Sequence, residues 1–165
     1  MSFTAVYLAL GSNQGDRGAF LTAGINDLLE RGVAISARSS IYETEAVSDH
    51  PQPAYLNQVV GGRTRLSPRA LLEACLEIER NHGRTRDPAL PKAARTLDID
   101  ILLYGDRVIR DPALTIPHPA MLERGFVRIP LAEIATPGLR HPVTRLRLDS
   151  AAPDPTVRLW ADDGR

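Results

Sequence analysis

The sequence predicts an α+β fold with a ferredoxin-like βαββαβ core, in which an antiparallel sheet carries its helices on one face. The first observation is the order strand, helix, strand, strand, helix, strand over residues 3–104. The second is that both expected helices begin at a good capping residue, Asp16 or Ser67, and carry apolar residues at helical spacing. The third is composition: 165 residues, 43% of them hydrophobic, suffice for one domain with its own core.

The first half of the chain predicts a strand, a helix and a second strand. Residues 3–10 are mostly apolar and end at a dense turn signal over residues 11–16. A helix capped by Asp16 is expected to run to about Arg31, where glycine closes it. Residues 33–42 alternate and predict the second strand, and the two prolines of residues 43–54 predict a long loop.

The next segment repeats this order. Residues 55–63 predict a third strand, and Ser67 followed by proline predicts a helix that runs to about Asn81. Cys75 falls in the apolar stripe of that helix, so we interpret it as core packing. After a basic loop, residues 95–104 predict the fourth strand, and the glycine turn that follows predicts a hairpin to residues 108–109.

Pro119 is followed by a short helical piece and then by residues 125–134, and the tail from Pro137 on is rich in Pro and Arg and weakly patterned. We expect a single domain over residues 1–165, with its core over about 3–137 and a C-terminal extension over 138–165. The large apolar residues of the extension are expected to pack against the domain: Leu146, Leu148, Leu159 and Trp160.

Charge and cysteine content exclude several classes of protein. The 20 basic and 20 acidic residues give a net charge of zero, which argues against a nucleic-acid or membrane-surface binder. One cysteine allows no internal disulfide. The opening residues lack the charged region and long apolar run of a signal peptide or membrane span. We therefore expect a cytoplasmic protein whose partners are small molecules.

Asp98 and Asp100 are the first candidates for chemistry. Side chains alternate along a strand, so both carboxylates project from one face. Two carboxylates this close repel each other unless a cation lies between them, and carboxylate oxygens suit Mg²⁺, which completes its coordination with phosphate oxygens and water. Taken alone, the pair favours the alternative of a solvated edge strand. The opposite face should point into a core through Leu97, Ile99, Ile101 and Leu103.

Arginines beside these aspartates change the balance. Arg84, Arg86 and Arg95 lie in or next to the loop that leads into the fourth strand. Guanidinium groups bind phosphate oxygens, so their proximity to metal-binding carboxylates predicts a polyphosphate site. The alternative is that they form surface ion pairs with Asp87 and Glu79. We favour the phosphate site because the three arginines and two aspartates fall within seventeen residues.

Tyr55 and Asn57 share one face of the third strand and form a candidate recognition pair. An aromatic ring can stack on a flat heterocycle while an amide donates and accepts hydrogen bonds. The strand pattern alone favours the alternative that Tyr55 is an ordinary core aromatic.

Seven short motifs together resemble a known enzyme family, and the resemblance covers roughly residues 3–137. The Arg-Thr-Leu-Asp-Ile-Asp run is the most specific of them, and the opening glycine motif is less so. In chain order they are Leu10-Gly11-Ser12-Asn13-Gln14-Gly15-Asp16, Tyr55-Leu56-Asn57, Gly83-Arg84-Thr85-Arg86, Arg95-Thr96-Leu97-Asp98-Ile99-Asp100-Ile101, Pro117-His118, Arg124-Gly125-Phe126-Val127 and Pro130-Leu131-Ala132-Glu133-Ile134-Ala135. The sequence resembles the 6-hydroxymethyl-7,8-dihydropterin pyrophosphokinases of folate biosynthesis.

The resemblance implies transfer of pyrophosphate from ATP to the hydroxymethyl group of the dihydropterin, with AMP as the second product. It implies two Mg²⁺ ions held by Asp98 and Asp100, catalytic roles for Arg84 and Arg95, and a monomer. The ATP-binding residues that it implies are Arg84, Arg86, Arg95, Ile101, Thr115, His118 and Arg124. The pterin-binding residues that it implies are Thr44, Val47, Tyr55, Asn57, Asp98 and Phe126.

Two other classes of protein remain as alternatives. An Asp-x-Asp enzyme such as a nuclease or nucleotidyltransferase would require a third acidic ligand, and a basic surface if it acted on nucleic acid. A non-catalytic ferredoxin-like binding module would tolerate the loss of an aspartate or arginine of the site, and none is missing here.

Overall fold

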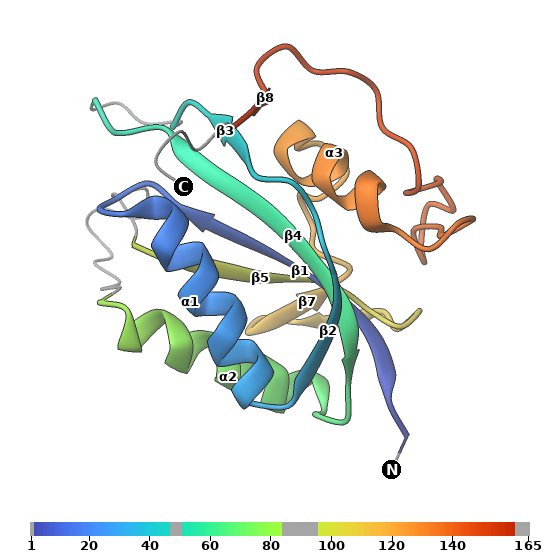
Figure 1. Cartoon of the computed structure of the whole chain (residues 1–165). Helices are drawn as coiled ribbons and strands as arrows, with labels where there is room; N and C mark the ends of the chain where they lie inside the picture. The colour runs from blue at the N-terminus through green and yellow to red at the C-terminus, as the bar shows by residue number, and fades with distance from the viewer. Residues whose placement is uncertain (1, 47–50, 84–95, 161–165) are drawn as a thin grey trace.

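The computed structural model describes residues 2–46, 51–83 and 96–160 and shows an antiparallel sheet with helices on both faces (Figure 1). The elements in chain order are β1 (Thr4–Ser12), α1 (Arg17–Glu30), β2 (Val33–Arg38), β3 (Tyr42–Thr44), β4 (Tyr55–Thr64), α2 (Pro68–Asn81), β5 (Asp98–Tyr104), β6 (Ile109–Asp111), β7 (Leu114–Ile116), α3 (Gly125–Ile134) and β8 (Arg158–Leu159). The predicted α+β class with an antiparallel sheet is therefore confirmed.

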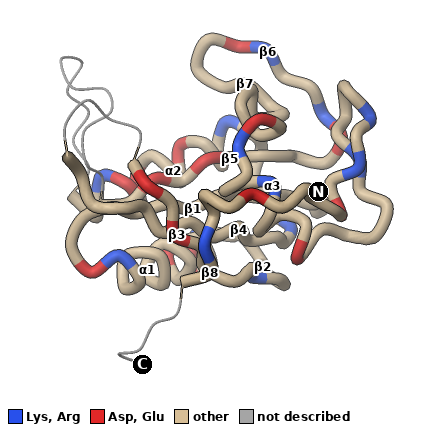
Figure 2. The backbone as a smooth tube through the Cα atoms, turned by 90° about the horizontal axis from the view of Figure 1, so that it is seen from above, with Lys and Arg blue, Asp and Glu red and all other residues tan. Residues whose placement is uncertain are grey.

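The main sheet has the strand order β5-β1-β4-β3-β8, and β2 also pairs with β4. All of these pairings are antiparallel. Strands β6 and β7 form a separate two-stranded sheet. Basic and acidic positions are scattered among each other over helices, strands and connecting segments (Figure 2). Among the described helices, none has the length and apolarity needed to cross a membrane.

The helix boundaries follow the predicted capping signals. Asp16 accepts a hydrogen bond from the Ala19 amide at 3.1 Å, and Ser67 accepts one from the Ala70 amide at 3.1 Å. Each bond satisfies one of the amides that the first turn of a helix leaves unpaired. Cys75 is 1% exposed in the core, as predicted, and burial raises the pKa of its thiol to about 12.

The core has two parts, one on each face of the sheet. The part beneath α1 and α2 includes Leu8, Ile25 and Ile78, and the part beneath α3 includes Val59 and Leu131. The sequence predicted helices on one face, with the other left for a ligand or for the remaining chain. The structure agrees with this prediction, because α3, from the remaining chain, covers part of the second face, and a cavity occupies another part.

Three local predictions are wrong. The second strand ends at Arg38 instead of residue 42, because the Ser39 hydroxyl accepts the Val59 amide at 2.9 Å in place of a backbone carbonyl. The expected hairpin after β5 does not form, since β6 pairs with β7. Leu103 belongs to the core beneath α3, because the β1–β5 register shifts between Ile101 and Leu103 and reverses the alternation there.

The C-terminal extension packs only in part as predicted. Leu148 is fully buried beneath α3, and Trp160 packs against the core beneath α1 and α2. Leu146 and Leu159 are 51% and 67% exposed, so the prediction is wrong for these two residues.

Candidate functional site

Asp98 and Asp100 project from the same face of β5, as the sequence predicted. Both line a cavity of about 510 Å³ on the α3 side of the sheet, whereas Ile99 and Ile101 between and after them pack into the core beneath α1 and α2. The strand therefore separates its functions by face: aliphatic residues anchor it to the core, and carboxylates face the cavity.

The sheet register places Asp98 in line with two residues of neighbouring strands. Gly11 of β1 pairs with Asn57 of β4 on one side and with Asp98 of β5 on the other. Because paired residues in adjacent strands share a face, these three positions form one row across the sheet. A methyl group built on Gly11 would lie 3.7 Å from Asn57 Oδ1 and 3.7 Å from Tyr55 Cδ1, so the bare glycine forms part of the cavity floor.

The cavity gathers residues from four strands and α3. Seven of them were predicted as site residues: Thr44, Tyr55, Asn57, Asp98, Asp100, Arg124 and Phe126. The remaining lining residues are Ala9, Leu10, Gly11, Glu45, Gln58 and Val127. The cavity thus joins a pair of carboxylates to two aromatic rings and an amide.

The hydrogen bonds of Asn57 fix which end of its amide faces the cavity. Its Nδ2 donates to Thr44 Oγ1 at 2.9 Å and to the Tyr42 carbonyl at 3.4 Å. A carbonyl can only accept, so the nitrogen must point toward Tyr42 and Oδ1 points toward Gly11 and the cavity. At this position the site offers an acceptor, which requires a donor on the ligand.

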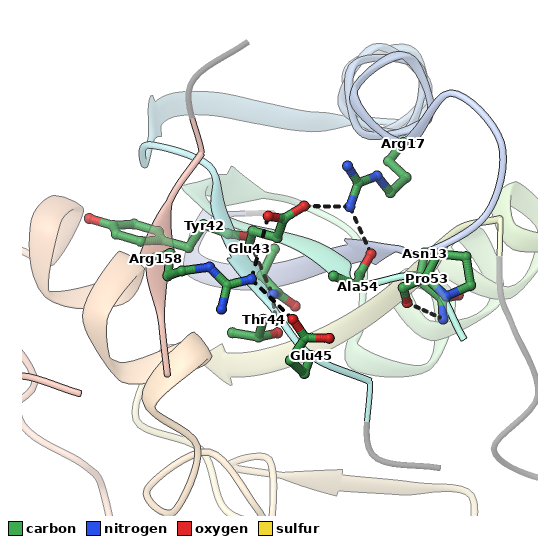
Figure 3. A network of polar contacts seen from close by, with 10 residues as sticks. Asn13, Arg17, Tyr42, Glu43, Thr44, Glu45, Pro53, Ala54 and Arg158 are labelled. Carbon is green, nitrogen blue, oxygen red and sulfur yellow. Dashed lines mark hydrogen bonds and ion pairs between the residues drawn. The ribbon is translucent and has the colours of Figure 1, made fainter. Parts of the chain in front are cut away.

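The opening motif holds the segment that leads into Tyr55. Asn13 is fully buried, and its Nδ2 donates to Gln52 Oε1 at 3.0 Å and to the Pro53 carbonyl at 3.3 Å. Arg17, at the start of α1, donates to the Ala54 carbonyl at 2.8 Å (Figure 3). These contacts fix residues 52–54 and thereby the start of β4.

The start of α3 supplies the opposite wall of the cavity. Arg124 occupies the N-cap position, and Phe126 lies in the first turn. The Arg124 guanidinium carbon is 5.5 Å from the centroid of the Phe126 ring, within the range of a cation–π contact. One short segment therefore presents an aromatic face and a positive charge side by side.

His118 lies beside the carboxylates and is held by its backbone and one ring nitrogen. Its amide donates to the Leu102 carbonyl at 3.0 Å, and its Nδ1 accepts from the Ala120 amide at 3.1 Å. The neutral ring therefore carries its proton on Nε2, which is 3.8 Å from Asp100 Oδ2. Burial lowers the pKa of His118, with a smaller contribution from the charge of Arg124.

Thr115 and His118 border a second cavity of about 210 Å³, which Arg110 and residues of the C-terminal extension also line. Neither Thr115 nor His118 lines the larger cavity. The proximity of His118 to Asp100 connects the two cavities at the carboxylate pair.

Glu79 and Ile101 differ from their expected environments. Glu79, considered above as a surface ion-pair partner, is 2% exposed and accepts the Ile99 amide at 2.8 Å. It therefore ties α2 to β5 between the two aspartates. Ile101, a predicted ATP contact, is 6% exposed in the core and lines neither cavity. The predicted residues Val47, Arg84, Arg86 and Arg95 lie outside the described residues.

Sequence reasoning missed several residues that line the cavity, chiefly Gly11, Glu45 and Val127. Gly11 was assigned to a turn, although it lies in β1. The signal for it was present, because Gly11 and Val127 belong to motifs that carried the family resemblance. Glu45 follows β3, a strand of only three residues between β4 and β8, for which the sequence gives no alternating pattern.

The carboxylate pair fits a magnesium site. In the described ranges 2–46, 51–83 and 96–160, no group of three or more His, Cys, Asp or Glu side chains is arranged to hold a metal. Asp98 and Asp100 supply two oxygen ligands from one strand face, and Mg²⁺ commonly takes one or two carboxylates and completes its shell with phosphate oxygens and water. The donor set is therefore suited to a metal that arrives with a polyphosphate.

Comparison with known sequences identifies relatives over most of the chain. Residues 7–136 match the family model described as 7,8-dihydro-6-hydroxymethylpterin-pyrophosphokinase. A 2-amino-4-hydroxy-6-hydroxymethyldihydropteridine pyrophosphokinase of Methylorubrum extorquens is 42% identical over 133 residues, which are 80% of this chain and 83% of the relative. A protein of the same name from Aquifex aeolicus is 39% identical over 153 residues and 93% of each chain.

Other relatives are longer than this chain. The folic acid synthesis protein fol1 of Pneumocystis carinii is 39% identical over 146 residues, and the chain spans 88% of its own length but only 19% of that protein. Among solved structures, an HPPK-DHPS in complex with substrates aligns with a TM-score of 0.68 at 15% identity, over 90% of this chain and 42% of that one. At that identity the structural likeness shows the fold alone.

Proposed function

The chain belongs to the 7,8-dihydro-6-hydroxymethylpterin-pyrophosphokinase family and is an ATP-dependent pyrophosphokinase of folate biosynthesis, and we propose that it transfers pyrophosphate from ATP to the hydroxymethyl group of 6-hydroxymethyl-7,8-dihydropterin. One observation carries this proposal: a single cavity joins the same-face pair Asp98 and Asp100 to the aromatic and amide groups of β4 and α3. One half suits a metal-bound triphosphate, and the other suits a flat, hydrogen-bonding heterocycle.

The pterin ring is assigned to the part of the cavity between Tyr55 and Phe126. Two aromatic rings from different elements line this part, and a flat heterocycle stacks well on such surfaces. The bonds from Asn57 Nδ2 turn its Oδ1 toward the same space, where this acceptor suits the N–H groups along one edge of a pterin. Thr44 holds the amide in that orientation, and Val47 stays a predicted contact.

The triphosphate is assigned to the part of the cavity at the carboxylates. Asp98 and Asp100 would hold two Mg²⁺ ions, and these ions would supply positive charge against the phosphate oxygens of the triphosphate. His118, with its proton on Nε2, supplies a neutral donor beside them. Arg124 adds positive charge from the α3 side, and Arg84, Arg86 and Arg95 stay predicted phosphate contacts.

The nucleoside is assigned to the side of His118 away from the pterin. The support is the second cavity, which Thr115 and His118 line. Ile101 is buried, so any contact that it makes with ATP is made by its backbone. This assignment places the two substrates on opposite sides of the carboxylate pair, as a transfer between them requires.

The reaction needs positioning and charge neutralisation more than covalent catalysis. The hydroxymethyl oxygen forms a bond to the β-phosphorus, the bond from that phosphorus to the α–β bridging oxygen breaks, and AMP leaves with the bonding electrons. The hydroxyl proton is released. The row of Asn57, Gly11 and Asp98 supports this geometry. It places the ring-binding Asn57 on the strand to one side of Gly11 and the metal-binding Asp98 on the strand to the other side.

The finer structural assignments are also proposals. The sheet order β5-β1-β4-β2, with α1 and α2 on one face, supports a ferredoxin-like core. We assign the whole chain to one domain with its core over residues 3–137, acting as a monomer in the cytoplasm on small-molecule substrates, and bound to neither nucleic acid nor membrane.

The proposed reaction is tested by incubating the protein with ATP, Mg²⁺ and 6-hydroxymethyl-7,8-dihydropterin and separating the products. We expect AMP and the pterin diphosphate to appear in equal amounts, and AMP release to require the pterin. Release of ADP or of free pyrophosphate would overturn the proposal. The family match does not favour the alternatives of a nucleotidyltransferase or a non-catalytic binding module.

A further inference from the structure

The last described strand lies outside the segment that matches the family. The match ends at residue 136, whereas β8 comes from residues 158–159 and pairs with β3 at the edge of the main sheet. Its neighbour β3 carries Thr44 to the wall of the larger cavity, and Glu45 follows directly. Part of the proposed pterin pocket is therefore backed by the extension.

Arg158 is the residue through which the extension contacts this wall. It pairs in register with Glu43, and its Nη2 lies 3.5 Å from Glu43 Oε1 and 3.3 Å from Glu45 Oε1 (Figure 3). Opposite charges at directly paired positions of adjacent strands attract. One guanidinium thus spans two carboxylates, the second of which lines the cavity.

The other side of Glu43 is also held. Arg17 of α1 donates from Nη1 to Glu43 Oε2 at 2.8 Å, so Glu43 lies between an arginine of α1 and an arginine of β8. The hydrogen bond from Arg17 is the main cause that lowers the pKa of Glu43, and Arg158 adds to it. Arg17 and Arg158 therefore hold the Glu43 carboxylate in place from two sides and favour its charged form.

Strand β8 has anchors that do not depend on Arg158. The Trp160 amide donates to the Ile41 carbonyl at 2.9 Å, and the indole packs against α1, where a methyl group on Gly18 would lie 3.2 Å from the ring. Removal of the Arg158 guanidinium should therefore leave β8 in place. Its effect is confined to the carboxylates that it contacts.

We propose that Arg158 is a positioning residue for the pterin pocket, which holds Glu43 and Glu45 so that Thr44 and the adjacent wall keep the shape that the ring requires. This inference rests on the proposed function. It assigns a role to the C-terminal extension, for which the family match gives none.

The test compares Arg158→Ala with the unaltered enzyme in steady-state kinetics and in pterin binding without turnover. Because the ion pairs are partly exposed, we expect KM and Kd for the pterin to rise about three- to fivefold, with kcat and KM for ATP unchanged. Arg158→Lys retains the charge and should restore pterin binding. Arg31→Ala, which removes an ion pair of 3.2 Å between the residue after α1 and Glu77 of α2, is the matched control and should change none of these values.

The emission of Trp160, the single tryptophan, separates positioning from a structural role. We expect the emission maximum and Tm of Arg158→Ala to match those of the unaltered protein. A red shift with parallel losses for both substrates would overturn the inference, as would unchanged pterin binding. If the unaltered protein neither binds nor converts the pterin, the proposed function itself fails, and this inference fails with it.

Discussion

Asn57 and Asp98 lie on opposite sides of Gly11 in one row across three adjacent strands, each paired in register with the glycine. The row sets the distance between the group assigned to the pterin edge and the group assigned to the metal. Because all three positions belong to the sheet, the spacing of their Cα atoms depends on backbone pairing alone, and the side-chain rotamers then set the distance between the amide and the carboxylate. Rigid elements of this kind hold reacting groups more accurately than loops do.

Gly11→Ala tests this floor directly. The new methyl group would lie 3.7 Å from Asn57 Oδ1, an ordinary van der Waals distance, so the fold should keep its stability. The methyl would occupy the cavity beneath the ring, and we expect KM for the pterin to rise about tenfold or more, the scale of a small steric conflict in a fitted pocket. Parallel measurement of Tm and steady-state rates checks it. An unchanged KM would show that the ring does not rest on this floor.

Asp98→Asn tests the metal assignment. The amide keeps the size of the side chain but removes its charge, so we expect Mg²⁺-dependent turnover to fall at least about 100-fold. The fold should persist, because the side chain faces the cavity and not the core. Product release is measured across a Mg²⁺ titration. Asp106→Asn, an exposed carboxylate in the turn after β5, is the control; near-normal turnover in the Asp98 variant would refute the assignment.

Asn57→Ala tests the orientation of the amide. It removes the acceptor that faces the cavity, and loss of one hydrogen bond with a buried partner corresponds to about a tenfold rise in Kd for the pterin. Thr44→Val should have a smaller effect, because the Tyr42 carbonyl still orients the amide. Calorimetric titration gives both values. If Thr44→Val weakened binding more than Asn57→Ala, the threonine and not the amide would be the recognition group.

Glu43→Gln tests the pH dependence of stability. Arg17 holds the pKa of Glu43 below its usual 4.5 in the folded state, so the group stabilises the fold above pH 4.5 and that contribution is lost as pH falls through the folded pKa. The stability difference between the unaltered protein and Glu43→Gln should therefore be present at pH 7 and shrink below pH 4.5. Urea unfolding of the two proteins at pH 7 and below pH 4.5 measures this difference. A difference in unfolding free energy that does not change with pH would contradict the prediction.

Gly125→Ala tests the contact between α3 and the extension. A methyl group on Gly125 would lie 2.3 Å from Asp154 Oδ2, and that carboxylate is held by the Thr156 amide at 2.9 Å and by its hydroxyl. We expect a loss of stability of about 1–3 kcal/mol and weaker pterin binding, because Phe126 follows directly. The double variant Gly125→Ala with Asp154→Gly removes the clash and should restore both stability and pterin binding. Without such rescue, the clash with Asp154 is not the cause.

The sequence was sufficient for features that local physics determines. The caps at Asp16 and Ser67 define helix starts without any tertiary information. The alternation of β5 places Asp98 and Asp100 on one face, since the period of a strand is two. The gathering of Tyr55, Asn57 and the aspartates around one cavity follows from the sheet order, in which β1 lies between β4 and β5.

The remaining features depend on partners far away in the chain. The side on which Leu103 lies is set by a register shift against β1, which only the paired strand reveals. Strand β8 has two residues, too few to show any alternation. The packing of α3 on the second face of the sheet depends on contacts of Val127 and Leu131 with the core that contains Val59. A local sequence pattern does not predict contacts between residues so far apart in the chain.

One contact of α3 bears on which ligands the site can accept. Near the C-terminal end of α3, Glu133 accepts hydrogen bonds from the Ser40 amide at 2.9 Å and from the Tyr42 hydroxyl. The first turn of the same helix carries Phe126. The far end of the helix that bears Phe126 is thereby tied to Ser40 and to Tyr42 of β3, so the part of the cavity lined by Phe126 and Tyr55 should resist widening. Bicyclic compounds with bulk above or below the ring plane should be rejected on thickness alone, even when their hydrogen-bonding edge is identical.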